Sequence, residues 1–106
     1  MNDYEDMSKN NFSRGDFVQC NYRARWKGII ISVEKMKDFD NKIHTVCEVL
    51  MLKDRCGRET TKGNVMRRGS GWLTEVEPFT VSKKQLNWLP PTTRSVLIKK
   101  GLVNEN

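Results

Sequence analysis

Most of the side chains in this sequence that could bind a ligand are cationic, and they lie in two stretches. The first stretch ends at residue 27, and the second runs from residue 53 to residue 68. Together they contain Arg14, Arg23, Arg25, Lys27, Lys53, Arg55, Arg58, Lys62, Arg67 and Arg68. Ammonium and guanidinium groups on exposed loops bind phosphate oxygens, so both stretches are predicted to contact a polyanion.

The charge of the whole chain agrees with this prediction. The formal net charge is +6, and all 19 Lys and Arg follow residue 7, whereas three of the 13 acids, Asp3, Glu5 and Asp6, precede it. A basic surface attracts nucleic acid above all, and acidic proteins as a second class of partner. The alternative is that the charge serves solubility alone.

Aromatic side chains accompany the cations. Trp26 and Trp72 flank the two basic stretches and are candidates for stacking on unpaired bases. With Tyr22 and Phe79 they could instead form a cage for a methylated cation. The stronger alternative is that these aromatics fill the core, because a small domain needs large apolar side chains there.

Catalytic and metal-binding patterns are missing from the sequence. His44 is the only histidine, and Gly69-Ser70-Gly71 lacks the Gly-x-Ser-x-Gly frame of a nucleophile elbow. The three cysteines Cys20, Cys47 and Cys56 lack the two-residue gap typical of zinc sites. We therefore expect no enzyme activity, no cofactor and no metal.

The surroundings of the cysteines indicate a compartment. Cys20 and Cys47 lie in apolar runs and are predicted to be buried, whereas Cys56 lies in a turn and is predicted to be exposed. A free exposed thiol favours a reducing cytoplasm. No apolar run approaches the 18 residues of a membrane span, and the acidic, polar start is not a signal peptide, so no membrane partner is expected.

Short β-branched runs separated by turns must position these side chains. The patterns predict a disordered tail over residues 1–11, then strands over 17–22, 26–34, 43–53 and 72–77, with 79–81 as a short final strand. In the strand 43–53 the odd positions are predicted to face inward, because Glu48 belongs to the even set. Gly28 marks a bulge or a close backbone approach.

The connections differ in how clearly they can be assigned. Residues 35–42 form a charged loop, 54–57 a tight turn in which Gly57 supplies a positive φ, and 69–71 a flexible turn. Residues 58–68 are polar and have no clear period.

The C-terminal part is predicted to be helical. Ser82 and Gln85 have the spacing of a capping box, and a single helical turn must close before Pro90 and Pro91. Thr93 is expected to cap a second short helix over 94–100, which ends at Gly101. The alternative for residues 95–98 is a strand.

Two segments carry a family resemblance. Arg14-Gly15-Asp16-Phe17-Val18, followed by Trp26-Lys27-Gly28-Ile29-Ile30, resembles the opening of SH3-like small barrels of the KOW and Tudor type. Residues 80–86 resemble their ending, a last strand reached through a short helical turn. The resemblance implies a mainly β fold with a small antiparallel barrel over residues 12–89, and it leaves 90–106 as a C-terminal extension with a short helix.

The resemblance also implies a function. KOW-type barrels bind RNA, DNA or the transcription and translation machinery, and Tudor barrels bind methylated Lys or Arg. The Asn- and Lys-rich style of the chain resembles small bacteriophage proteins. We therefore predict a non-catalytic nucleic-acid-binding protein, with duplex DNA favoured over RNA. The alternative is a protein-interaction module or inhibitor that docks on an acidic surface of host machinery.

Overall fold

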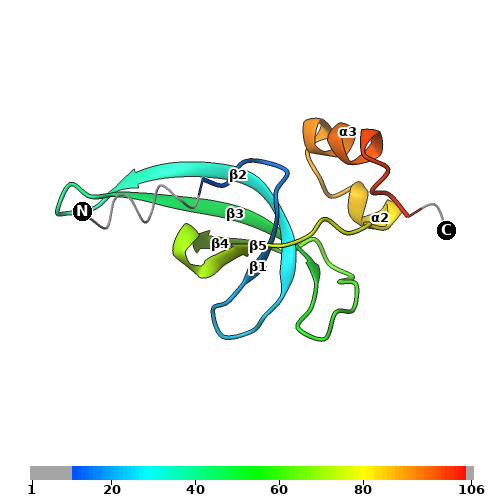
Figure 1. Ribbon diagram of the computed structural model, residues 1–106, viewed down its shortest axis with the longest axis horizontal. Coiled ribbons are helices and arrows are strands. Elements are labelled where there is room, and N and C mark those ends of the chain that lie inside the picture. The colour runs from blue at the N-terminus through cyan, green and yellow to red at the C-terminus, as the bar shows by residue number, and fades with distance from the viewer. Residues whose placement is uncertain (1–10, 105–106) are drawn as a thin grey trace.

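One five-stranded antiparallel sheet forms most of the molecule (Figure 1). This computed structural model describes residues 11–104. The strands are β1 (Phe17–Cys20), β2 (Lys27–Lys37), β3 (Ile43–Lys53), β4 (Val65–Gly69) and β5 (Leu73–Glu75). They lie in the order β4-β3-β2-β1-β5, so the first strand pairs with the last. The mainly β prediction is confirmed, and the predicted tail lies outside the described residues except for Asn11.

The β2–β3 hairpin is the longest part of the sheet. β3 has the predicted bounds, whereas β2 continues through residues 35–37, which were expected to be a loop. β1 pairs with β2 only up to Ile29, and β4 pairs with β3 only from Val46 onward. Residues 33–45 therefore form a two-stranded ribbon with a turn at its tip, which we name the arm. Figure 1 shows it projecting from the body of the molecule.

The backbone of β3 approaches β2 closely at Gly28. The pairing of β2 with β3 shifts register between Lys27 and Gly28. A Cβ atom on Gly28 would collide with the backbone carbonyl of Leu50 and lie 2.9 Å from Cγ1 of Val49. The prediction for Gly28 is therefore confirmed: the strand pairing has a bulge there, and the neighbouring backbone also lies close.

A first core fills the concave side of the sheet. Its buried members are Val18, Cys20, Trp26, Ile30, Cys47, Val49 and Leu73. Cys47 and Val49 belong to the odd set of β3, so the inward prediction holds for them, and Cys20 and Cys47 are buried as expected.

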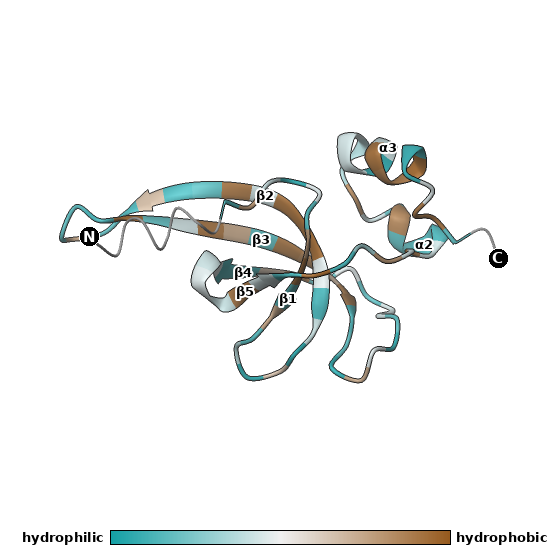
Figure 2. Ribbon diagram, viewed as in Figure 1, coloured by the Kyte–Doolittle hydropathy of each residue, from teal (hydrophilic) through white to brown (hydrophobic). Residues whose placement is uncertain are grey.

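A second core covers the opposite face of the same strands. There Phe17, Ile29, Leu50 and Leu52 pack with residues that follow the sheet, namely Val81, Leu86, Leu89 and Leu97. Figure 2 shows the apolar colour running along the middle of β2 and β3. Leu50 and Leu52 belong to the even set, so the single inward face was wrong at this end of β3. The C-terminal helices bury the second face.

Those helices are α2 (Lys83–Leu86) and α3 (Pro91–Lys99). The capping box is confirmed, because Ser82 Oγ accepts from the backbone N–H of Gln85 and the Gln85 side chain accepts from the N–H of Ser82. α3 begins at Pro91, three residues before its predicted start, and Thr93 is a buried residue inside it rather than its cap. Proline is favoured at the first helical position because it has no N–H to satisfy.

The segment after Pro90 is a helix and not a strand. Residues 95–98 lie within α3, so the strand alternative was wrong. Gly101 adopts φ +70°, and the N–H of Leu102 donates to the carbonyl of Leu97 at 2.9 Å. This is the predicted glycine-terminated helix end.

The stretch between β3 and α2 departs most from the predictions. The polar residues 58–68 contain most of β4, which ends at Gly69. The rest of the expected flexible turn at 69–71 belongs to a 3₁₀ helix, η1 (Ser70–Trp72), with Ser70 buried. β5 is shorter than the predicted 72–77, and of residues 79–81 only Val81 forms a bridge, with Val103. No helix within residues 11–104 is long and apolar enough to cross a membrane.

Candidate nucleic-acid interface

The antiparallel pairing of β2 with β3 brings two basic loops to one end of the sheet. Lys27, the first residue of β2, pairs with Lys53, the last residue of β3. The loop that leads into β2 and the loop that follows β3 therefore lie at the same end of the sheet, as Figure 1 shows. We name the cations there the basic end: Arg23, Arg25, Lys27, Lys53, Arg55, Arg58 and Lys62.

The basic end lacks compensating acids. Five of its side chains are exposed, and Lys27 and Lys53 are half-buried. No ion pair joins any of the seven to a carboxylate of residues 11–104. The carboxylate of Asp54 is engaged within its own turn, where Oδ1 accepts from the N–H groups of Cys56 and Arg58, both at 2.9 Å. The N–H of Arg58 is the main cause that lowers the pKa of Asp54. The side chains are therefore available to an external anion.

The β3–β4 loop is fixed to the body by α2. Nε2 of the buried Gln85 donates to the carbonyl of Leu52 at 2.8 Å and lies within 3.4 Å of the carbonyl and hydroxyl of Thr60. The ring of Trp88 covers Gly63 so closely that a Cβ there would lie 3.1 Å from it. The sequence pattern indicated only the capping role of Gln85. The hydrogen bonds of its side chain join Gln85 to Leu52 and Thr60, which precede it by 33 and 25 positions. No local sequence pattern indicates contacts between residues so far apart.

Aromatic rings lie beside the basic end, at the junction of β1 and β5. Tyr22 meets Trp72 edge-on with ring centroids 4.8 Å apart, and the Arg23 guanidinium lies 5.1 Å from the Tyr22 centroid. Trp72 is 49% exposed, which suits a stacking role. Trp26 is only 4% exposed and belongs to the first core, so its candidacy for stacking was wrong.

The four-membered aromatic cage is not assembled. Phe79 lies on the other face of the sheet against Phe17, with ring centroids 4.7 Å apart, and Lys53 Nζ lies 4.4 Å from its centroid. The Arg68 guanidinium already covers the Tyr22 and Trp26 rings, at 5.5 and 5.9 Å from their centroids. An internal cation thus occupies the place that a methylated ligand would need.

Of the three remaining predicted cations, Arg68 borders the basic end, because its guanidinium and that of Arg23 both lie near the Tyr22 ring, whereas Arg14 and Arg67 lie elsewhere. Arg68 is half-buried in the aromatic contact just described, and Arg67 extends across β3 to Glu34 of the arm, at 3.4 Å. Arg14 is exposed in the turn before β1, where the following N–H, that of Gly15, donates to the carbonyl of Ile30. Proximity in the sequence grouped Arg14 and Arg67 with the others, but strand pairing separates these two from the basic end.

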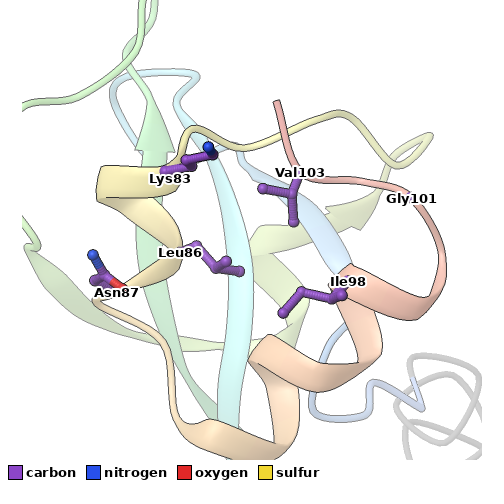
Figure 3. Close-up of a pocket in the computed structure, with 6 residues that line it drawn as sticks. All are labelled: Lys83, Leu86, Asn87, Ile98, Gly101 and Val103. Atoms are coloured by element: carbon purple, nitrogen blue, oxygen red, sulfur yellow. The ribbon is translucent and has the colours of Figure 1, made fainter. Parts of the chain in front are cut away.

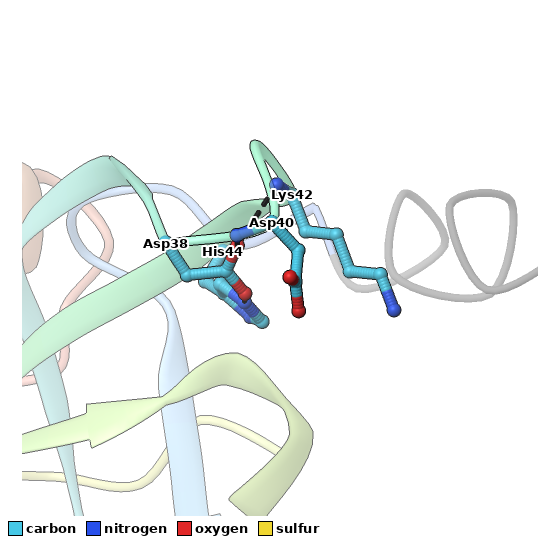
Figure 4. A network of polar contacts seen from close by, with 4 residues as sticks. All are labelled: Asp38, Asp40, Lys42 and His44. Atoms are coloured by element: carbon cyan, nitrogen blue, oxygen red, sulfur yellow. Dashed lines mark hydrogen bonds and ion pairs between the residues drawn. The ribbon is translucent and has the colours of Figure 1, made fainter.

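The arm ends in a turn closed by Asp38 (Figure 4). Asp38 Oδ1 accepts from the N–H groups of Asp40 and Lys42, both at 2.9 Å, and Oδ2 lies 2.6 Å from Nε2 of His44. The hydrogen bond with His44 is the main cause that lowers the pKa of Asp38. Phe39 follows Asp38 and is fully exposed. This segment was predicted to be a charged loop, and the aromatic side chain at its tip was overlooked.

A cavity of about 420 Å³ lies between α2 and the end of α3 (Figure 3). Leu86, Ile98 and Val103 give it apolar walls, and Asn87 contributes an amide. None of the predicted site residues lines it. Within residues 11–104, no three His, Cys, Asp or Glu side chains come together as a metal site.

Comparison with known proteins adds no relative to this description. No family model matches the chain, and neither curated proteins nor solved structures give a match.

Proposed function

We propose that this protein binds nucleic acid through the basic end and catalyses no reaction, with duplex DNA favoured over RNA. The observation that carries the proposal is the convergence of two separate basic loops at one end of the sheet, without carboxylate partners among residues 11–104. Phosphate oxygens are the ligands that such a group of cations attracts most strongly. The exposed ring of Trp72 next to it offers a stacking surface for a base.

We also propose that the sheet is an SH3-like barrel of the KOW and Tudor type. Two features support it: β1 pairs with both β2 and β5, and the 3₁₀ turn η1 leads directly into β5, the last strand. The resemblance had assigned this ending to residues 80–86, whereas those residues run from the Val81 bridge into α2. The exposed thiol of Cys56 supports a reducing compartment such as the cytoplasm.

The test is duplex binding measured by fluorescence anisotropy across a salt series. The variant Arg55→Ala/Arg58→Ala removes two exposed cations of the basic end. Each lost phosphate contact lowers the slope of log affinity against log salt by about 0.9, so we expect weaker binding and a slope reduced by about one to two. The control is Lys99→Ala/Lys100→Ala, which removes the same charge from exposed positions at the end of α3 and should change neither quantity.

Two outcomes contradict the proposal. Equal losses in both variants would mean that net charge acts without a defined site. A wild-type protein that binds neither DNA nor RNA at low salt would leave an acidic protein surface as the partner of the basic end.

A further inference from the structure

The arm turn, residues 38–42, and the turn that opens the β3–β4 loop, residues 54–58, have the same construction. In each, an aspartate at the first position accepts from the N–H groups two and four residues later. In each, the N–H of that aspartate donates to the carbonyl of the fifth residue. The fourth residue has a positive φ in both, +62° at Asn41 and +82° at Gly57. We name them the arm turn and the loop turn.

The matched positions carry different side chains. The second position is Phe39 in the arm turn and Arg55 in the loop turn, and both are exposed. The fifth position is a cation in both, Lys42 and Arg58. The same backbone therefore presents an aromatic ring at one end of β3 and a guanidinium at the other.

Counted together with Arg67, the arm carries four cations against three acids, and this small excess favours an anionic partner. Glu34 is paired with Arg67, and Asp38 is bound by His44 and two N–H groups, which leaves Asp40 as the acidic side chain of the arm without a partner among residues 11–104. The arm also carries three exposed lysines, Lys35, Lys37 and Lys42, of which Lys35 donates through Nζ to Thr45 Oγ1 at 2.9 Å. Exposed Val33 and Ile43 lie on the same face as Lys35 and Lys37, by the alternation of the strands.

The length of β3 limits the distance between the two turns. They are separated by β3 alone, and the 12 residue steps from Lys42 to Asp54 span at most about 40 Å at 3.3 Å per residue. The curvature of β3 in Figure 1 shortens this span. One helical turn of B-DNA covers about 34–36 Å, so the two turns can reach one face of a duplex in successive windings.

We propose that the arm is a second contact with duplex DNA and that Phe39 inserts its ring between base pairs as a wedge. Small apolar or aromatic side chains at the tips of basic elements enter the stack in this way and kink the duplex. A fully exposed Phe held by a closed turn has its backbone fixed before it meets the DNA. This inference rests on the proposed function of the basic end and adds a second site to it.

The experiment compares four proteins on duplexes of two lengths. On a duplex of about 20 base pairs, Phe39→Ala should bind about 5- to 150-fold more weakly than the wild type, the range for losing one aromatic–base stack. Phe39→Trp should bind like the wild type. Val96→Ala, which trims an exposed apolar side chain on α3, is the control and should also bind like the wild type. On a duplex of about 8 base pairs, too short for both contacts, wild type and Phe39→Ala should bind equally.

Insertion has its own readout. A 20-base-pair duplex containing 2-aminopurine should brighten when the wild type binds, because the base analogue loses stacking, and should not brighten with Phe39→Ala. Equal affinities and equal fluorescence for these two proteins would overturn the inference. If Arg55→Ala/Arg58→Ala still weakens binding in that case, the proposed function stands without the wedge.

Two further outcomes would contradict the inference, one through self-association and one through a lack of duplex binding. Phe39→Ala that leaves duplex binding unchanged but lowers the sedimentation mass of the free protein would overturn the inference in favour of a second copy of the chain. A wild type that binds no duplex of either length would remove the proposed function and the wedge together.

Discussion

The arm turn and the loop turn are the same local structure in opposite surroundings. The loop turn follows Leu52, which is fully buried, and its loop is tied to α2 through Gln85. The arm turn precedes Ile43, which is 47% exposed, and the first buried residue of β3 is Thr45. In both places the five-residue turn is closed by hydrogen bonds to its own aspartate, so it does not depend on packing against a hydrophobic core. The surrounding structure decides only what the turn can reach.

The largest expected difference lies in the strand that joins the two turns. Leu52→Ala should lower the free energy of unfolding by about 2–5 kcal/mol, because it leaves a cavity in the second core. Ile43→Ala trims the same strand where it is exposed and should cost less than about 1 kcal/mol. Urea denaturation of both variants measures the contrast. Equal costs would mean that the arm end of β3 is buried in solution.

A smaller effect is expected at the fourth position of each turn. Gly57→Ala should cost about 1–2 kcal/mol, because an L side chain is strained at φ +82°. Gly57→Asn should recover part of that loss, since asparagine already occupies the same position of the arm turn with φ +62°. Asn41→Gly should change the free energy of unfolding by less than about 0.5 kcal/mol. If Gly57→Asn costs as much as Gly57→Ala, the two turns are not equivalent.

The smallest effect concerns pH, and it separates the two aspartates. Both have a pKa below the ordinary 3.8, so each carboxylate stabilises its turn above about pH 3.8 and stops doing so as the pH falls through its lower folded-state pKa. NMR titration of the carboxyl groups and of the Lys42 and Arg58 amides follows this loss. His44→Ala should raise the pKa of Asp38 toward 3.8 and leave that of Asp54 unchanged. A parallel change in both would mean that His44 does not act through its hydrogen bond.

Local patterns in the sequence predicted the elements that depend on local causes. The bounds of β3 follow from its alternating apolar run and the Asp54–Gly57 turn, and the capping box at Ser82 needs only residues three apart. β4 was missed because it is an edge strand with few buried side chains, so its polar sequence resembles a loop.

The site depended on contacts distant in the sequence. Arg25 and Arg55 lie at the same end of the sheet because the strand register pairs Lys27 with Lys53. Trp26 is buried because it packs with residues of β1, β2, β3 and β5 in the first core. Neither leaves a periodic pattern. Phe39 was overlooked because a single aromatic residue inside a charged loop has no neighbour that marks its exposure.

The second core also sets an order of events in biosynthesis. Phe17, Ile29, Leu50 and Leu52 belong to the strands, but they are covered by residues 81–103, which leave the ribosome after all five strands. The nascent sheet therefore carries an uncovered apolar face until that segment arrives, and a chain halted before it would be prone to aggregation or chaperone capture. Val103, which forms a parallel bridge with Val81, belongs to this late segment.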